Sequence, residues 1–365
     1  MIDALIKELS ISSSKKEIIN TVYFGGGTPS LLTVNELKKL LDAAHQYFDI
    51  ATDAEITLEA NPDDINEIKL AEWKLVGINR FSIGIQSFSQ PDLEWMNRAH
   101  NAEQALRCIE LVKSAGFQNY SVDLIYGTPT LSYDNWKKNV QTVIDLGVPH
   151  LSCYALTVES DTALQKMITL KKKEEVDPEK QASQFLLLTG WLGDAGYEHY
   201  EISNFAKPGY RSKHNSSYWQ RKTYIGIGPS AHSFDNTARR WNVSNNALYI
   251  QSLQKDIIPY DEEKLSEVQK LNEYIMTSLR TSEGIDLDIV EETFGKEKRR
   301  SLESESRKHI QNHKLLPIAI GTTNPVRPGH AGGHKIILTN EGKLFADGIA
   351  ADLFFEENLI SPSSL

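Results

Sequence analysis

The stretch TVYFGGGTPS, residues 21–30, decides the fold of this chain. Its strand-like first half runs straight into three glycines, and Thr28 and a proline follow them. Glycine leaves the backbone without a side chain and allows left-handed conformations, so a run of glycines at a strand end is typical of a loop that a ligand approaches closely. The stretch therefore predicts a strand, a turn and a binding loop in immediate succession.

Segments with strand and helix periodicity alternate outward from this stretch. The first helical segment begins with the capping box Thr33-x-x-Glu36 and continues with an apolar stripe. The stripe comprises Leu37, Leu40, Leu41, Ala44 and Phe48. The next strand-like segments are 55–62, 80–87, 120–127 and 150–157, and the helical ones between them are 65–77, 91–115 and 134–147. This repeat predicts an α/β fold with a parallel sheet, and the apolar strands favour a (β/α) barrel, or part of one, over a doubly wound sheet.

Consecutive strand segments each end in a polar residue. These residues are Thr28, Glu59, Gln86 and Asp123. Singly they have ordinary explanations: Glu59 could cap a helix and Gln86 could bond a loop carbonyl. Asp123 could pair with a buried arginine such as Arg98. Together they indicate one site, because the carboxyl ends of the strands in such a barrel converge on the active site.

The residue types at these strand ends favour one kind of ligand. Backbone amides at a glycine-rich turn suit a phosphate, but the sequence has neither G-x-x-x-x-G-K-[ST] nor G-x-G-x-x-G there, and the loop holds no lysine or arginine. Two carboxylates, an amide and a hydroxyl suit a ligand with an ammonium group and ribose hydroxyls instead. A phosphate-ester enzyme on a barrel stays an alternative that lacks its phosphate clamp.

Composition argues against several classes of function. The 365 residues carry a formal net charge of −10 with scattered basic residues, which disfavours a nucleic-acid backbone or an anionic membrane as partner. No apolar run has the length of a membrane span and the amino terminus lacks the features of a signal peptide, so a cytoplasmic location is expected. Cys108 and Cys153 are too far apart for a cysteine-rich metal site, and both are predicted to lie in the core.

Further motifs connect the chain to a known family. They are VYFGGGTPSLL, EANPDD, GINRFSIGIQSF, LEWMNRAHNAEQA, VDLIYGTP and LSCYALTVESDT. Together they resemble the oxygen-independent coproporphyrinogen III oxidases and their heme-chaperone relatives in the radical S-adenosylmethionine (SAM) superfamily, over nearly the whole chain. The resemblance implies that Gly26, Gly27 and Thr28 contact the methionyl part of SAM through their backbone. The positions that it implies for binding SAM or a second SAM molecule are Glu59, Gln86, Arg98 and Asp123.

Another motif selects the heme-chaperone branch of this family. HNSSYW, residues 214–219, is similar to the H-N-x-x-Y-W pattern that the branch associates with heme binding. The resemblance implies that His214 ligates heme iron from an exposed loop, and that Tyr218 and Trp219 offer flat apolar surface to the macrocycle. The alternative is a loop whose aromatic pair packs on the domain and whose histidine has a capping role.

One element of the family pattern is missing from this chain. Family members carry a CxxxCxxC loop after the first barrel strand, and its thiolates hold a 4Fe–4S cluster that reduces SAM to a 5′-deoxyadenosyl radical. This chain begins with the helix expected after that loop, so a partial barrel without its first strand is predicted, and Cys108 and Cys153 cannot replace the cluster ligands. A native form that begins further upstream is favoured over a cluster-free descendant.

The resemblance implies a cytoplasmic heme chaperone that delivers heme to apo-hemoproteins, with peripheral contact to membrane hemoproteins left open. The alternative is an oxygen-independent coproporphyrinogen III oxidase of porphyrin biosynthesis, and no catalytic residue is assigned. The barrel core with the extension that carries HNSSYW is expected over 1–255, and a small, mainly helical carboxyl-terminal domain over 262–365. Segment 321–334 is interpreted as a loop insertion whose His330 and His334 bind no metal.

Overall fold

The computed structural model describes residues 1–318 and 334–357 and divides into two compact units. The first unit comprises Met1–His199 and Ser203–His214. The second comprises Tyr200–Ile202 and Asn215–Leu365. The domain boundary expected between residues 255 and 262 stays a prediction.

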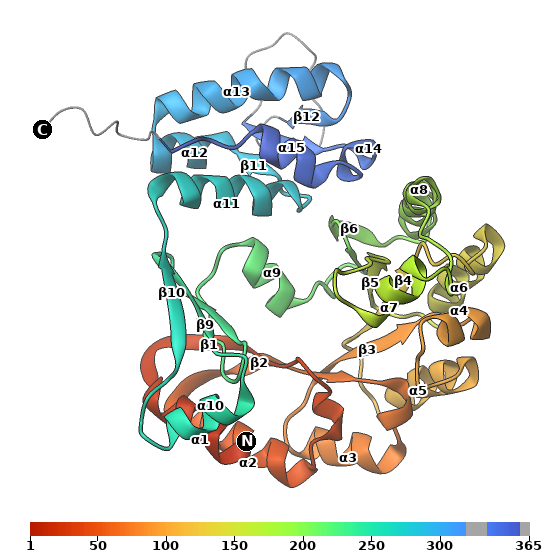
Figure 1. The fold of residues 1–365 in the computed structure, drawn as a ribbon, viewed down its shortest axis with the longest axis vertical. Coiled ribbons are helices and arrows are strands. Elements are labelled where there is room, and N and C mark those ends of the chain that lie inside the picture. The colour runs from red at the N-terminus through yellow and green to blue at the C-terminus, as the bar shows by residue number, and fades with distance from the viewer. Residues whose placement is uncertain (319–333, 358–365) are drawn as a thin grey trace, which may run out of the picture. The chain divides into compact units, whose positions relative to one another are not determined.

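One curled sheet has the strand order β1-β2-β3-β4-β5-β7-β6 (Figure 1), and all of it except Tyr200 and Glu201 of β6 lies in the first unit. Strands β1 to β5 pair in parallel, each with the next along the chain, and β7 runs antiparallel to β5. The strands are β1 (Ser14–Phe24), β2 (Phe48–Ala60), β3 (Arg80–Gln86), β4 (Tyr120–Tyr126), β5 (His150–Ala155), β6 (Glu198–Glu201) and β7 (Asn204–Ala206). The sheet of a partial barrel that the sequence predicted is therefore confirmed.

Helices precede, connect and follow the parallel strands, and the connecting helices cover the outer side of the sheet (Figure 1). They are α1 (Ile2–Ile11), α2 (Val34–Tyr47), α3 (Glu67–Leu75), α4 (Gln90–Trp95), α5 (Ala102–Ser114), α6 (Tyr133–Asp145), α7 (Ala163–Thr169) and α8 (Pro178–Asp194), with 3₁₀ turns at Pro29–Leu31 and Pro62–Asp64. The capping box that starts α2 is confirmed, since the Thr33 hydroxyl accepts from the Glu36 amide and the Glu36 carboxylate accepts from the Thr33 amide. Such reciprocal bonds satisfy backbone donors that a helix start leaves without partners.

The core of the first unit lies between these helices and the sheet. The predicted stripe of α2 is buried, and its last member, Phe48, is buried at the start of β2. Both cysteines are buried as predicted, Cys108 on α5 and Cys153 on β5. Burial raises the pKa of the Cys108 thiol to about 12, so this sulfur behaves as an apolar core atom.

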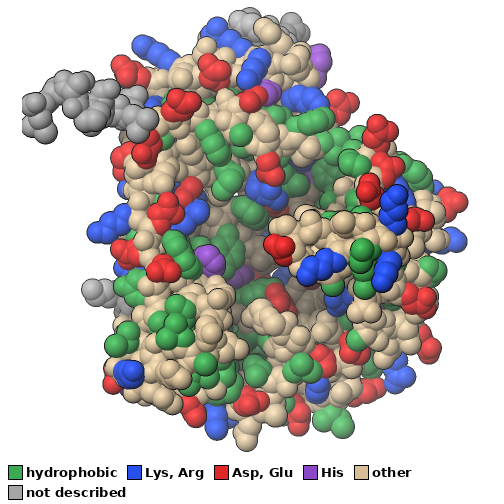
Figure 2. Space-filling model, in the orientation of Figure 1, with side chains coloured by type: hydrophobic (Ala, Val, Ile, Leu, Met, Phe, Trp, Pro, Cys, Tyr) green, Lys and Arg blue, Asp and Glu red, His purple; other side chains and the backbone are tan. Residues whose placement is uncertain are grey.

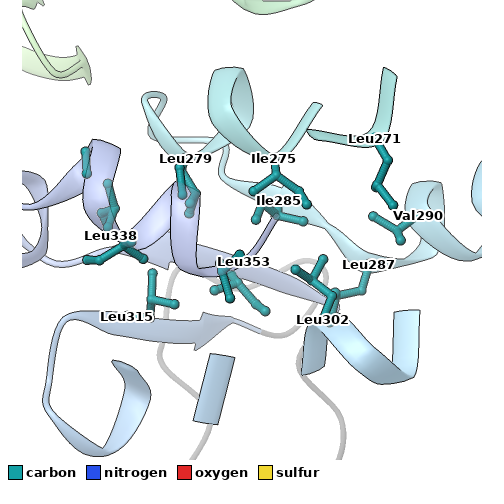
Figure 3. Packing of buried hydrophobic residues seen from close by; sticks show 14 residues of the cluster. Leu271, Ile275, Leu279, Ile285, Leu287, Val290, Leu302, Leu315, Leu338 and Leu353 are labelled. Atoms are coloured by element: carbon teal, nitrogen blue, oxygen red, sulfur yellow. The ribbon is translucent and has the colours of Figure 1, made fainter. Parts of the chain in front are cut away.

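The second unit contains two small antiparallel sheets, β10-β9-β8 and β11-β13-β12. Its elements are β8 (His232–Phe234), β9 (Ala238–Asn242), α10 (Asn246–Leu253), β10 (Tyr260–Lys264), α11 (Glu267–Leu279), β11 (Ile285–Asp286), α12 (Leu287–Phe294), α13 (Lys296–Gln311), β12 (Leu315–Ile318), β13 (Lys335–Leu338), α14 (Asn340–Lys343) and α15 (Ala346–Asp352). Leu271, Ile275 and Leu279 of α11 pack with Leu338 and Leu353 in one apolar core (Figure 3). The mainly helical part expected at the carboxyl end is present.

Charged side chains of both signs share the surface of the molecule. On the face drawn in Figure 2, Lys and Arg side chains are interspersed with Asp and Glu. No helix within residues 1–318 and 334–357 has the length and apolar character needed to cross a bilayer. The proposed insertion 321–334 lies outside the described residues except for His334, whose Nδ1 is 2.7 Å from Asp288 Oδ2.

Candidate functional site

The glycine loop after β1 has the backbone that its sequence predicted. Gly26 and Gly27 have φ of 77° and 64°, in the left-handed region that side chains disfavour. Gly25 is required for a different reason: a Cβ there would lie 2.6 Å from Cε1 of Tyr23 and 3.0 Å from Oε1 of Glu59. Thr28 follows the exposed glycines and precedes the 3₁₀ turn at Pro29–Leu31. The loop thus exposes main chain at the end of β1.

Glu59, at the end of β2, fastens this loop to the sheet. Its Oε1 accepts from the Tyr23 hydroxyl at 2.7 Å, and its Oε2 accepts from the Gly26 amide at 3.2 Å. It is not a helix cap, since the side chain of Asn66 caps α3. Two of the sequence-predicted site residues, Gly26 and Glu59, are therefore in direct contact.

A second cluster of polar groups surrounds Gly84 of β3. Arg98 Nη2 donates to Asn61 Oδ1 at 3.0 Å and to the Gly84 carbonyl at 3.4 Å. A Cβ on Gly84 would lie 3.0 Å from Nε2 of Gln86, which itself has a φ of 68°. Gln86, Arg98 and Asn61 therefore converge above a residue that has no side chain. Asn61 is an addition to the residues expected from sequence.

The electrostatics of Arg98 suit an anionic or carbonyl ligand. Burial lowers the pKa of its guanidinium, while Asp63 and Asp123 act in the opposite direction. Its buried Nε has no hydrogen-bond partner among the described residues. A buried donor of this kind is ordinarily satisfied in folded proteins, so the position fits a ligand acceptor.

Asp123 lies on β4, within electrostatic reach of Glu59. Desolvation raises the pKa of Asp123 to about 6, hydrogen bonds from Ser152 and Ser82 lower it, and the charge of Glu59 adds to the increase. The Ser82 hydroxyl lies 3.3 Å from Asp123 Oδ2. The suggested pairing of Asp123 with Arg98 is not what the structure shows, because the Arg98 guanidinium donates to Asn61 and Gly84. The carboxylates predicted for one site are thus near neighbours.

The HNSSYW motif forms a helix, which corrects the expectation of an exposed loop. It lies in α9 (Lys213–Trp219), and the carboxylate of Glu55 accepts from the amides of Lys213 at 3.1 Å and His214 at 3.0 Å. These bonds satisfy backbone donors at the start of a short helix. The side chain that supplies the cap lies far away in the sequence, on β2.

His214 is partly buried against β1 rather than exposed. Its Nδ1 lies 2.9 Å from the Thr21 hydroxyl, and its ring stacks on Tyr23 with centroids 4.6 Å apart and planes 16° apart. Burial lowers the pKa of His214 to about 4, with Glu55 opposing and Arg80 reinforcing the shift. The imidazole is therefore neutral at pH 7, which is the form that ligates metals.

The aromatic members of the motif make contacts in the second unit. Tyr218 is 39% exposed and meets the Tyr224 ring edge to face, with centroids 4.7 Å apart. The Arg280 guanidinium lies 5.0 Å from the centre of the Trp219 ring. Tyr218 thus keeps accessible ring surface, while its predicted contact with heme stays a prediction.

Several residues around His214 were not found from the sequence. Thr21 and Tyr23 alternate along β1, and the register pairs them with Glu55 and Thr57 of β2. Alternate residues share a face of a strand, so the polar positions in TVYF and EITLE were the available signal. The partner of Glu55 is Arg80, whose Nε lies 3.7 Å from Glu55 Oε2, and both side chains are almost fully buried.

An iron–sulfur cluster does not fit the residues that this chain supplies. Cys108 and Cys153 are buried on separate elements, and the described part of the chain contains no group of three or more His, Cys, Asp or Glu side chains suited to a metal ion. A 4Fe–4S cluster needs three or four thiolates. No step of chemistry is derived through it.

Comparisons with known proteins agree with this architecture. The model of the radical SAM superfamily matches residues 2–167. The heme chaperone HemW of Bacillus subtilis is 30% identical over 352 residues, which is 95% of this chain and 89% of that protein. HemW of Synechocystis is 33% identical over 287 residues, 78% of this chain and 70% of that protein.

A solved structure shows the same fold. Coproporphyrinogen III oxidase (HemN) from Escherichia coli, a radical SAM enzyme, aligns with a TM-score of 0.80 over 97% of this chain and 82% of its own. The sequence identity of this pair is 18%, so the likeness establishes the shared fold alone.

Proposed function

Since this chain belongs to the HemW family of heme chaperones within the radical SAM superfamily, we propose that it binds heme at His214 and delivers it to apo-hemoproteins. The observation that carries this proposal is the environment of His214. The ring is held by a hydroxyl and a stacked tyrosine, and its lowered pKa keeps it neutral. A neutral imidazole of fixed orientation is a common axial ligand of heme iron.

The neighbouring strand ends are proposed to bind SAM. The main chain of Gly26, Gly27 and Thr28 would receive its methionyl part. Glu59, Gln86, Arg98 and Asp123 would supply the polar contacts. The unpartnered Arg98 Nε and the open backbone at Gly26 support this assignment. SAM bound beside a reduced cluster would be a source of a radical. In this proposal, the residues of the chain only bind SAM.

Delivery to apo-hemoproteins, including those at a membrane surface, and a cytoplasmic location belong to the same proposal. The chaperone role is supported by the relatives of this chain, which are heme chaperones. Tyr218 would contribute ring surface to the bound macrocycle, in line with its exposure.

Heme titration of the purified chain tests the proposal. We expect the parent protein to give a Soret band when heme is added. The heme affinity obtained from this band should be roughly tenfold or more lower in His214→Ala, because an axial ligand is lost. His45→Ala is the matched control, since His45 is exposed on α2, and it should titrate as the parent protein does. Equal heme affinity in parent and His214→Ala would refute heme ligation by His214.

The oxidase alternative rests on the shared fold and on the motifs that resemble both the oxidases and the heme chaperones. Formation of protoporphyrinogen from coproporphyrinogen III, in an anaerobic assay with SAM and a reductant, would favour it over the chaperone. Tight binding of a sugar phosphate without affinity for SAM would instead favour a phosphate-ester enzyme.

A further inference from the structure

The chain turns sharply at Gln86, the last residue of β3. Its φ is 68°, and the Ser87 amide donates across it to the Ile85 carbonyl at 2.9 Å. A hydrogen bond that spans two residues around a left-handed central residue is typical of the γ-turn with positive φ, which is rare because it strains the backbone. Such strain persists only where the surrounding structure holds it. Groups that bond to this turn therefore decide whether Gln86 keeps its conformation.

Two side chains from the segment after α4 bind consecutive carbonyls of β3. Arg98 Nη2 donates to the Gly84 carbonyl at 3.4 Å. His100 Nε2 lies 2.9 Å from the Ile85 carbonyl oxygen. Because a carbonyl oxygen only accepts, Nε2 carries the proton of this hydrogen bond. The Ile85 carbonyl thus accepts from Ser87 within the turn and from His100 outside it.

His100 is a buried and neutral imidazole in this position. The residue is 2% exposed. Burial lowers its pKa, the bond to Ile85 opposes this shift, and the charge of Arg98 reinforces it. Its Nδ1 is buried and has no hydrogen-bond partner among the described residues. Within that part of the chain, the bond to Ile85 is therefore the one that orients the ring.

The turn determines where the Gln86 amide lies. A Cβ on Gly84 would be 3.0 Å from Gln86 Nε2, 3.5 Å from Arg98 Nη2 and 3.7 Å from Asn61 Oδ1. These polar groups therefore meet above bare main chain, where a ligand can approach. The φ of Gln86 sets the direction of its Cα–Cβ bond, so relaxation of the turn would move the amide away from this point.

The residue after the turn is held separately. Ser87 is buried, and its hydroxyl donates to Asp92 Oδ2 at 3.1 Å and accepts from Asn139 Nδ2 at 2.9 Å. These bonds fix the side chain of Ser87 beyond the turn. The carbonyl on the other side of the turn is the group that His100 holds.

We propose that His100 is a positioning residue for the SAM site, holding the Ile85 carbonyl so that Gln86 keeps its turn. Its role rests on the proposed binding of SAM by Gln86 and Arg98, and His100 acts through Gln86 without contacting SAM. Loss of its N–H donor leaves the strained turn with the bond from Ser87. The binding-competent conformation of Gln86 is then less populated, and SAM binds less tightly.

Two substitutions separate the donor from the bulk of the side chain. His100→Leu removes the ring N–H, whereas the amide of His100→Gln places an N–H donor at nearly the distance of Nε2 from the main chain. Isothermal titration calorimetry with SAM measures both. We expect roughly tenfold weaker binding in His100→Leu, and binding within about threefold of the parent in His100→Gln. His45→Leu, at an exposed position of α2, is the matched control and should bind SAM as the parent does.

A double-mutant cycle tests whether His100 acts through Gln86. Gln86→Ala removes the amide that the turn positions, so His100→Leu should cause no further loss of SAM affinity in that background. A further loss of about tenfold there would overturn the proposal. An equal loss in His100→Leu and His100→Gln would also overturn it, because packing rather than the N–H donor would then matter.

The outcomes separate the role of His100 from the function on which it rests. Absence of SAM binding by the parent, or unchanged SAM affinity in both Gln86→Ala and Arg98→Ala, would overturn the proposed SAM site itself. Weaker binding in Gln86→Ala together with parent-like binding in His100→Leu would overturn the role of His100 alone.

A measurement on the unmutated protein covers the case in which His100→Leu does not fold. In the protein labelled with ¹⁵N-histidine, the signal of His100 is identified by its absence in His100→Gln. Nitrogen chemical shifts show which ring nitrogen carries the proton. A proton on Nε2 is expected with and without SAM. A proton on Nδ1 alone would refute the proposal, because Nε2 could then not donate to Ile85.

Discussion

At the scale of single residues, Tyr23 connects the features of the site. Its hydroxyl donates to Glu59 and its ring stacks on His214, so one side chain contacts both the proposed SAM-binding carboxylate and the proposed heme ligand. Burial and the nearby Glu59 carboxylate raise the pKa of Tyr23, which keeps the hydroxyl protonated as a donor.

Tyr23→Phe removes this hydroxyl and retains the ring. We expect the free energy of unfolding to fall by about 1–3 kcal/mol, because a partly buried oxygen of Glu59 loses its donor. Urea unfolding measures the change. Tyr133→Phe is the control, since Tyr133 is 46% exposed on α6, and it should differ little from the parent. A similar loss in both variants would contradict the importance of the bond to Glu59.

Asp123 should make stability depend on pH. Its pKa of about 6 in the folded protein exceeds the ordinary value of 3.8, so the folded state binds this proton more tightly than the unfolded chain. The contribution of Asp123 to stability therefore falls as the pH rises from about 4 to about 6, by about 3 kcal/mol for a difference of about 2 pKa units.

Asp123→Asn removes that titration. Between about pH 4 and about pH 6, the parent should lose stability relative to Asp123→Asn, because only the parent has this carboxyl group. Above about pH 6, the difference in unfolding free energy between the two proteins should stay constant. Chemical denaturation at a series of pH values checks this, and a difference independent of pH would contradict the raised pKa.

At the scale of elements, the ion pair of Glu55 and Arg80 holds the start of α9 on the sheet. Glu55→Ala should lower the free energy of unfolding by about 3–5 kcal/mol, because it leaves the Arg80 charge buried without its partner. Asp42→Ala, which breaks the exposed Lys38–Asp42 pair of α2, should change it by less than about 1 kcal/mol. Thermal and urea unfolding of both variants measure the contrast. A small effect in Glu55→Ala would show that water or another group compensates Arg80.

Helices and strands were predicted correctly where the residues that determine them are close together in the sequence. The capping box at Thr33, the stripe from Leu37 to Ala44 and the alternation of strands and helices all depend on residues within a few positions of each other. The helix at HNSSYW was missed for the opposite reason. Its first amides donate to Glu55, which lies 159 positions from His214, so a contact that is distant in the sequence helps to fix its start.

At the scale of the whole molecule, the first unit brings distant residues to one face of its sheet. Gly26 lies in the loop after β1, whereas Glu59 and Asp123 lie on β2 and β4, and parallel pairing aligns these strands. The convergence of strand ends was predictable, because it follows from the topology of parallel β/α units. The individual contacts were not, because they depend on register and on the length of each side chain.

By itself, the sequence determined the α/β repeat, the glycine loop, the buried cysteines and the family of the chain. These follow from periodicity, turn chemistry and contiguous motifs, which act over short distances along the chain. Only the tertiary structure decided that His214 lies against Thr21, 193 positions away, in a helix capped by Glu55. The physical reason is that strand pairing and burial set such contacts, and both depend on the fold of the whole unit rather than on neighbouring residues.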